Sequence, residues 1–305
     1  MASPIKTPIG ILTFSDDGRL AKHALFVTDP EKAVDEFLAA PEQTAYIGAS
    51  LRPHAISLGF VADDSAWVRF MSQFALALSR KGLKGIIGRD KLAVHANNAL
   101  ESLDKVLSVF LERLTEWYTL HYPELRIAGR ELLAKTLAYG TREQFPDFAG
   151  SAGAELTDSD KEALFAYARM IASVNEERRM LEHYVRRVMT EIAPTTCSLV
   201  DPLLAAKMLA GAGSLQKLAR LPASAIQLLG AEKALFRHLK KQGKSPKYGI
   251  LFLDNRIQNA RAENRGKVAR IIASKLMVAA RIDYYSGRLE EKLRKEMDEE
   301  IDSIK

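Results

Sequence analysis

Two long stretches of this chain place hydrophobic residues at alternating intervals of three and four positions. The first runs from Ala93 to Trp117 and the second from Leu164 to Ile192. Hydrophobic residues that return to one helix face over several heptads predict a coiled-coil seam. Two long helices with matching seams favour an antiparallel hairpin or coiled coil, although the core of an ordinary helical bundle has the same spacing.

The second stretch has one charged residue, Arg178, among its seam positions. A charge inside a seam lowers stability and can specify the register or the partner of a coiled coil. Because the two seams present more hydrophobic surface than one hairpin needs to bury, we expect this region to form a homodimer. The positions expected at the dimer contact are Leu164, Ile171, Arg178, Leu181, Val185 and Val188.

Polar and aromatic residues mark the ends of these two predicted helices. Thr157 and Asp160 have the spacing of a capping box at a helix N-terminus, and Pro194 predicts the end of the second helix. Between the helices, the aromatic run from Trp117 to Tyr122 predicts a packed corner rather than a ligand site.

The regions on either side of the hairpin have different patterns. Residues 1–88 alternate short strand-like and helical runs, which predicts a small α/β domain. The runs predict a strand at 9–14 with a hairpin partner at 20–27, a helix at 30–38, a further strand within 51–61 and a helix at 65–78.

Residues 196–305 predict a helical domain. They include a short extended run at 248–252, a helix on which Lys267 and Arg270 face solvent, and a solvent-facing helix at 290–305. The predicted fold is therefore mostly α. A small N-terminal α/β domain (1–88) is followed by long antiparallel coiled-coil helices (89–195) and a helical C-terminal domain (196–305).

Composition excludes several classes of protein. Hydrophobic residues make up 47% and charged residues 27% of the 305 residues, as in a soluble globular protein. No apolar run approaches the ~20 residues that span a bilayer. The single cysteine, Cys197, cannot form an internal disulfide, and no Cys/His cluster has zinc-ligand spacing. We therefore expect a cytoplasmic protein that binds no membrane and no metal.

The net charge of +6 is concentrated in one stretch, 222–247. Between residues 230 and 250 there are six Lys or Arg residues and one Glu. Gly230 and Ala231, which have almost no side chain, precede these cations. A smooth helix face followed by clustered cations favours binding to a phosphate backbone. A basic run is also commonly a solvated helix face, and charge alone does not separate the two interpretations.

The order of the residues in this stretch favours RNA binding. Residues 211–240 closely resemble the signature of the Nop domain, the RNA–protein binding module of box C/D ribonucleoproteins. The resemblance extends upstream through 90–92, 103–105 and 116–125, and downstream through 265–270. It is interrupted at 253–255, where Leu-Asp-Asn replaces the Gln-His-Pro that is common in the family.

The resemblance implies a set of binding residues. Gly230, Ala231, Glu232 and Lys233 match the GAEK motif of the family. The remaining positions that we expect to contact RNA or a partner protein are Gln227, Arg237, His238, Lys240, Lys247, Arg265, Lys267 and Arg270.

The resemblance also implies partners and a function. Archaeal-type Nop core proteins hold the methyltransferase fibrillarin at one end and pair with a second copy through a coiled coil. At the other end they grip a box C/D guide RNA together with a kink-turn-binding, ribosomal-protein-like protein. By this resemblance the chain positions fibrillarin for site-specific 2′-O-methylation of rRNA or tRNA. S-adenosylmethionine is then bound by fibrillarin, and this chain needs no cofactor.

Enzyme signatures do not compete with this interpretation. The chain has no G-x-S-x-G, Walker or dinucleotide-binding motif. Glu232 and His238 are six positions apart, which places them on different faces of a helix. Two alternatives stay open, a splicing-type Nop-domain protein without a methyltransferase partner and a coiled-coil adaptor with an incidental basic patch.

Overall fold

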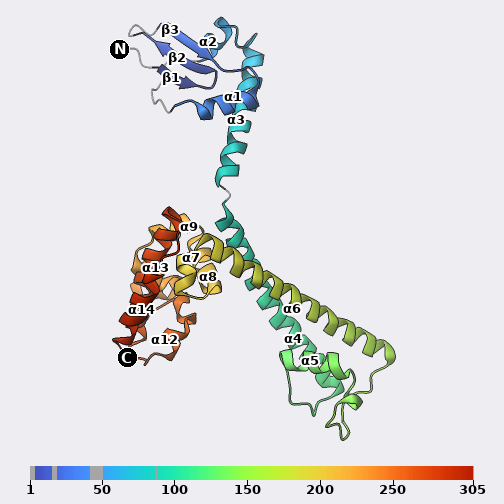
Figure 1. Cartoon of the computed structure of the whole chain (residues 1–305). Coiled ribbons are helices and arrows are strands. Elements are labelled where there is room, and N and C mark those ends of the chain that lie inside the picture. The colour runs from blue at the N-terminus through green and yellow to red at the C-terminus, as the bar shows by residue number, and fades with distance from the viewer. Residues whose placement is uncertain (1–3, 16–18, 42–50, 87, 305) are drawn as a thin grey trace. The chain divides into compact units, whose positions relative to one another are not determined.

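The computed structural model describes residues 4–15, 19–41, 51–86 and 88–304. These residues form two compact units, Met1–Gly88 and Arg89–Lys305. The predicted fold class is confirmed, since the chain is mostly helical with a small N-terminal sheet (Figure 1).

The first unit packs helices against a three-stranded antiparallel sheet. Its strands pair in the order β1-β2-β3, and side chains such as Leu12, Val34 and Phe74 fill its core. A Cβ at Gly10 would lie 2.2 Å from the carbonyl oxygen of Ala24, so β2 and β3 can approach only with glycine there. The elements are β1 (Pro4–Thr7), β2 (Gly10–Phe14), β3 (Leu20–Leu25), α1 (Pro30–Ala39), α2 (Leu51–Ser57) and α3 (Asp64–Ile86).

The strand predicted within 51–61 is wrong, because residues 51–57 form the short helix α2. Pro53 lies in the first turn of this helix, where a missing backbone N–H costs no hydrogen bond. Ala55 is buried against the core, and Phe60 packs edge-on against Phe70 of α3. Tertiary packing therefore outweighs the strand-like spacing of the segment.

The second unit begins with a long helical hairpin. Helices α4 (Arg89–His121) and α6 (Asp158–Ile192) pack side by side, and α5 (Gly129–Tyr139) covers the end of the pair where the chain turns back (Figure 1). The 3₁₀ turn η1 (Arg142–Gln144) lies in the connection. The capping box at the start of α6 is confirmed, with Thr157 and Asp160 bonded reciprocally.

The buried face of α4 is rotated slightly from the predicted one. Leu100, Leu107 and Leu114 are buried as expected, but Trp117 is 37% exposed whereas Tyr118 is 1% exposed. The Tyr118 hydroxyl donates to the Gly140 carbonyl at 2.7 Å, which anchors the ring under α5. Burial raises the pKa of Tyr118 well above its ordinary value.

The tip of the hairpin is built around His121 and Arg142, both buried. The Arg142 guanidinium donates to the carbonyls of His121 at 2.7 Å and Gly153 at 2.9 Å, and also pairs with Glu155. The Arg142 backbone N–H donates to Nε2 of His121 at 3.3 Å, so the proton of the ring lies on Nδ1, which bonds to the Ala154 carbonyl. The predicted packed corner is therefore correct for Tyr118, His121 and Tyr122.

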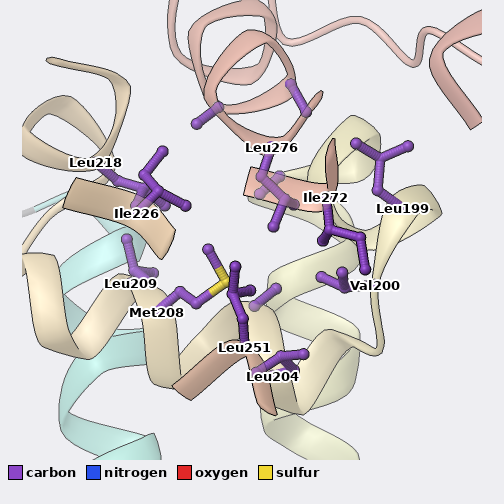
Figure 2. Packing of buried hydrophobic residues seen from close by; sticks show 14 of the residues in the cluster. Leu199, Val200, Leu204, Met208, Leu209, Leu218, Ile226, Leu251, Ile272 and Leu276 are labelled. Carbon is purple, nitrogen blue, oxygen red and sulfur yellow. The ribbon is translucent and has the colours of Figure 1, made fainter. Parts of the chain in front are cut away.

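The remaining helices form the C-terminal part of the second unit. Their shared core includes Leu204, Met208, Leu251, Ile272 and Leu276 (Figure 2). The elements are α7 (Pro194–Leu199), α8 (Pro202–Ala212), α9 (Leu215–Arg220), α10 (Ala223–Leu228), α11 (Glu232–Leu239), η2 (Ile250–Leu253), α12 (Asn255–Asn259), α13 (Arg265–Tyr285) and α14 (Lys292–Asp302).

Two details of this region differ from the predictions. The extended run expected at 248–252 contains the start of the 3₁₀ turn η2, Ile250–Leu253. Helix α14 is not simply solvent-facing, because Leu293, Met297 and Ile301 are buried against the core.

Val185 and Val188 of α6 belong to the same core, so no division into compact units occurs near residue 195.

Within the described ranges, no helix combines the length and the apolar character needed to cross a membrane. The same residues contain no group of three or more His, Cys, Asp or Glu side chains that could hold a metal ion.

Candidate functional site

The candidate site is centred on the junction between α10 and η2. The backbone N–H of Gly249 donates to the carbonyl of Gln227 at 2.9 Å, and that of Ile250 donates to the carbonyl of Leu229 at 2.7 Å. The Gln227 side chain donates to the Lys247 carbonyl at 2.6 Å. These bonds hold residues 247–250 against residues 227–229. Helix α11 (Glu232–Leu239) and the basic loop that follows it (residues 240–247) lie between the two joined segments.

Gly230 is required by this junction. It has a φ of +82°, and a Cβ would lie 2.4 Å from Cγ1 of Ile250. Gly230 and Ala231, which have almost no side chain, were expected to contact RNA or a partner protein. The close approach at Gly230 is instead made by Ile250 of the same chain, although Gly230 itself stays exposed and Ala231 is half-buried.

Glu232 also has a local role. Its Oε1 accepts a hydrogen bond at 2.7 Å from the backbone N–H of Gly230, so the carboxylate turns back onto the loop that precedes α11. Glu232 is the only acidic residue between 202 and 253, a range with nine Lys or Arg residues. Its position leaves the cations of α11 without an ion-pair partner among the described residues.

Lys233 and Arg237 lie four residues apart on α11, so their side chains share one face. Both are exposed. No side chain of α11 is buried, and Phe236 is 59% exposed. Lys240 follows at the end of the helix, with its Nζ 4.5 Å from the centroid of the Phe236 ring. The helix therefore projects from the domain and presents cations together with apolar side chains.

His238 shapes the loop after α11. Its Nδ1 lies 3.0 Å from the Gly243 carbonyl, and Lys241 adopts a left-handed φ of 59° that ends the helix. Lys247 lies further along and is exposed. A Cβ at Gly266 would lie 3.7 Å from Cδ of Lys247, so the basic loop returns to the first turn of α13.

The three cations of α13 predicted to bind RNA have different roles. Arg265 is half-buried, donates to the carbonyls of Ala260 at 3.1 Å and Gln258 at 3.0 Å, and lies over the ring of Phe252. It therefore holds the loop that precedes α13. Lys267 and Arg270 are exposed, and neither forms an ion pair with any described residue.

The structure thus brings most of the predicted residues into one region. Gln227, Gly230 and Glu232 fix its backbone, and Lys247 connects the basic loop to the start of α13. Among the predicted residues, those that form no ion pair within the described part of the chain are Lys233, Arg237, Lys240, Lys247, Lys267 and Arg270. Such a set of cations on an ordered surface can bind phosphate groups.

Two residues that shape this region, Gly249 and Tyr248, were not predicted from the sequence. Gly249 is needed because a Cβ there would lie 2.0 Å from the Leu229 carbonyl oxygen. Tyr248 stacks on Phe252 with ring centroids 4.8 Å apart and an interplanar angle of 9°. A Tyr-Gly pair after a basic loop was the available signal, but only the fold shows which backbone it approaches.

Cys197 has no features of a nucleophile. It is half-buried, and this burial raises the pKa of its thiol to about 12. The negative charge of Asp283 contributes to the same shift. The thiolate is the reactive form of cysteine.

The residues predicted at a dimer contact are placed differently from the expectation. Leu164, Ile171, Val185 and Val188 are each 0% exposed within the single chain, and Leu181 is half-buried. A side chain without exposed surface cannot contact a second copy. The prediction that these four residues form the dimer contact is therefore corrected, because they close the chain's own hairpin and core.

Arg178 likewise makes its contacts within the chain. Its guanidinium pairs with Asp104 of α4 and with Glu182 one turn along α6, and the hydrogen bond to Asp104 is the main cause that raises the pKa of Arg178. Arg186 continues this network from Glu182 to Asp201, the N-cap of α8. The charge in the seam thus specifies how α4, α6 and α8 fit together.

Comparisons with known proteins place the candidate site within a family match whose description names RNA binding. Residues 127–303 match the Nop family, described as "snoRNA binding domain, fibrillarin". A NOP5 family protein of Methanocaldococcus jannaschii is 34% identical over 270 residues, covering 81% of this chain and 65% of that protein. Human nucleolar protein 56 is 33% identical over 316 residues, covering 92% of this chain and 53% of that protein. Nucleolar protein 58 of Debaryomyces hansenii is 38% identical over 243 residues, covering 72% and 47%.

This chain therefore spans about half to two thirds of the length of these relatives. A solved structure, the crystal structure of a fibrillarin/Nop5p complex, contains a chain that matches with a TM-score of 0.51 and 25% identity. That match covers 99% of this chain and 100% of the other. Because the family match extends over more than half of the residues, this chain belongs to the Nop family, which includes NOP5 and nucleolar proteins 56 and 58.

Proposed function

We propose that this chain is a non-catalytic scaffold of a box C/D-type ribonucleoprotein. In this proposal its C-terminal helices bind guide RNA together with a kink-turn-binding, ribosomal-protein-like protein. Its N-terminal unit holds fibrillarin, which binds S-adenosylmethionine and methylates the 2′-oxygen of rRNA or tRNA. The chain itself contributes positioning, because it keeps the methyltransferase within a set reach of the target nucleotide.

The observation that carries the RNA-binding part is the set of unpaired cations on a rigid junction. Lys233 and Arg237 project from α11, while Gln227, Gly230 and Gly249 fix the backbone from which α11 starts. Cations held on an ordered backbone lose little conformational entropy when they meet phosphates, so they bind more tightly than the same cations in a mobile tail.

The apolar side chains of α11 support a composite partner rather than RNA alone. Phe236 and Leu239 are 59% and 70% exposed, beside Arg237 and Lys240. Phosphates do not cover apolar side chains, whereas a small protein bound to the RNA could. The surface therefore suits an RNA that is already bound by a protein.

The fibrillarin part is supported by the extent of the structural similarity. The chain from the fibrillarin/Nop5p complex matches 99% of this chain, and the match therefore includes the N-terminal sheet and its helices. The first unit also has a hydrophobic core of its own, so it can act as a separate docking module.

The homodimer remains part of the proposal, with a different contact surface. Val106, Val109, Trp117 and Leu120 follow one another at intervals of three, eight and three residues, which places them on one side of α4, and all are exposed, from 37% to 67%. Met170 and Met180 of α6 are exposed as well. Trp117 also packs its ring against Tyr167 of α6, with ring centroids 6.0 Å apart, and the exposed surface of these side chains is open to a second copy.

A gel-shift series with a kink-turn guide RNA tests the proposal. We expect weak binding by the chain alone and much tighter binding when the kink-turn-binding protein is present. Addition of fibrillarin and S-adenosylmethionine should then start methyl transfer to a paired target. Methyl transfer in a preparation without fibrillarin would contradict the scaffold role.

The salt dependence of this binding tests the individual cations. Replacing Lys233 or Arg237 with Ala should weaken binding and flatten the slope of log K against log salt by about 0.7–0.9 for each lost phosphate contact. Arg169→Ala is a matched control, because Arg169 is exposed on α6 far along the hairpin and forms no ion pair with a described residue. Unchanged slopes for both Lys233→Ala and Arg237→Ala would place the phosphate contacts elsewhere.

Two other functions are separated by simple assays. A splicing-type Nop-domain protein would bind kink-turn RNA but would not retain fibrillarin in a pull-down. A coiled-coil adaptor with an incidental basic patch would bind RNA without preference for a kink-turn. The glycine-fixed junction at Gly230 favours an RNA-binding protein over the adaptor, because an incidental basic patch needs no such backbone.

A further inference from the structure

Helix α13 has an outward face that extends beyond the site described above and is interrupted only where Met277 and Val278 are half-buried. Lys267, Arg270, Ser274, Arg281 and Tyr285 follow one another at intervals of three, four, seven and four residues, and all five are exposed. Ile272, Leu276 and Ala280, on the opposite face, are buried. The spacing places the five exposed residues on one side of the helix.

The far end of this face gains charge from a neighbouring helix. Nε of Arg281 donates to the carbonyl of Ala219 at 3.2 Å, which brings Arg281 beside Arg220 at the end of α9. Residues 202–231 and 264–282 contain no Asp or Glu. Among the described residues, neither arginine has an ion-pair partner, so the field of both charges is available to a ligand.

Aromatic side chains lie immediately after these arginines. Tyr284 and Tyr285 are 37% and 73% exposed, and their ring centroids are 4.8 Å apart at an interplanar angle of 74°. Proteins that bind single-stranded nucleic acid combine cations that track the backbone with exposed aromatic rings on which bases stack. Two arginines close together favour an anionic ligand, and the exposed rings beside them suit the bases of a nucleic acid.

The backbone under the tyrosines is firmly held. The buried carboxylate of Asp283 accepts hydrogen bonds at 2.8 Å from the backbone N–H groups of Thr195 and Thr196. Gly287, with a φ of 64°, ends the helix two residues after Tyr285. The next carboxylates, Glu290 and Glu291, follow this turn, and the Glu290 backbone is bonded to Thr195 on the inner side of α13. The exposed rings are therefore presented on a rigid support.

We propose that the outward face of α13 is a second RNA-binding surface, which guides a single-stranded segment from Lys267 to a base-stacking platform at Tyr285. Arg270, Arg281 and Arg220 contact its phosphates on the way. The path from Lys267 to Tyr285 covers eighteen residues of helix, or about 27 Å. This inference rests on the proposed function only in taking RNA as the ligand of the first site.

Fluorescence anisotropy with the full chain and the kink-turn-binding protein tests this inference. The probes are a kink-turn RNA hairpin and the same hairpin with a single-stranded extension of about ten nucleotides at either end, which is within the ~4–16 nucleotides that single-strand-binding modules cover. We expect the wild-type chain to bind at least one extended RNA roughly 5-fold or more tightly than the hairpin, as one base–aromatic stack provides.

Matched variants separate stacking from general effects. Tyr285→Ala should remove the advantage of the extended RNA and leave binding of the hairpin unchanged, while Tyr285→Phe should keep the advantage. Arg220→Gln should reduce it, and Arg220→Lys should largely preserve it. Because Tyr285 is mostly exposed, its replacement should not alter thermal unfolding.

The possible negative results separate the second RNA-binding surface from the proposed function. Equal affinity of the wild-type chain for the hairpin and both extended RNAs would overturn the second surface and leave the proposed function standing. An unaltered advantage in Tyr285→Ala would overturn it as well. Absence of binding to any of the RNAs, with the kink-turn-binding protein present, would refute the proposed function and this inference together.

Discussion

Gly230 shows how a single residue determines the candidate interface. Its left-handed φ of +82° turns the chain from α10 into α11, and its lack of a side chain admits Ile250. The same turn brings the N–H of Gly230 within reach of Glu232. One glycine therefore sets the direction of α11, and with it the direction in which Lys233 and Arg237 project.

Replacement of Gly230 by Ala should destabilise the protein. A left-handed backbone costs a residue with a Cβ about 1–2 kcal/mol, and the contact of 2.4 Å with Ile250 adds an overpacking cost of about 1–3 kcal/mol. Gly213→Ala is the control, because Gly213 has a φ of +85° with nothing within 4 Å of a Cβ. Urea unfolding should show the larger loss for Gly230→Ala, and equal losses would remove the role assigned to Ile250.

At the scale of elements, the hairpin is organised by polar contacts at its tip as much as by its apolar seam. Glu124 accepts hydrogen bonds from the Ser151 hydroxyl at 2.6 Å and from the Ala152 N–H at 2.7 Å. The bond from Ser151 is the main cause that lowers the pKa of Glu124. A Cβ at Gly153 would lie 2.2 Å from the His121 carbonyl oxygen, so the returning loop packs directly on α4.

These contacts predict a pH dependence of the tip. A carboxyl group whose pKa is lowered on folding stabilises the folded state above its ordinary pKa and loses that contribution as the pH falls through the lowered value. Wild type should therefore melt at a higher temperature than Glu124→Gln at pH 7. The difference should begin to shrink near the ordinary glutamate pKa of about 4.3 and disappear only below the lowered pKa of Glu124.

Glu112→Gln is the matched control for this measurement, because Glu112 is exposed on α4, the helix that precedes the turn containing Glu124, and has no described ion pair. A difference between wild type and Glu124→Gln that persists unchanged at low pH would show that the carboxylate charge is not the cause.

At the scale of the whole molecule, the second unit joins the hairpin and the C-terminal helices through one core. Val185 and Val188 of α6 pack with residues of α8 and α13. At the start of α4, Asp90 accepts from the Leu215 N–H at 2.9 Å and Lys91 donates to the Gly213 carbonyl at 2.9 Å. The hairpin is thus built into the domain that carries the candidate interface, and a dimer formed through it would set the spacing of two such interfaces.

The dimer proposal makes opposite predictions for the two faces of the hairpin. Val109→Glu combined with Leu120→Glu changes only exposed positions, so we expect monomers by light scattering with little change in melting temperature. Val185→Lys places an unpaired charge at a position that is 0% exposed, and should cost on the order of 3 kcal/mol or more of unfolding free energy. A Val109→Glu, Leu120→Glu variant that stays dimeric would place the contact on another surface.

The sequence by itself determined the class of fold, the two long helices and the location of the basic stretch. Heptad spacing, the capping box at Thr157 and Pro194 are local signals, and a helix responds to local signals because its hydrogen bonds join residues four apart. The charge of the stretch around Lys233 and the resemblance of residues 211–240 are likewise properties of the chain in order.

Only the tertiary structure decided which residues within these elements are buried, paired or free. It turned Leu164, Ile171 and Val185 inward, paired Arg178 with Asp104 and placed Ile250 against Gly230. These outcomes depend on contacts between residues far apart in sequence, which heptad spacing and local charge do not specify. For the same reason the sequence showed Arg220, Arg281 and Tyr285 as unrelated residues, and it was the packing of α9 against α13 that joined them into one surface.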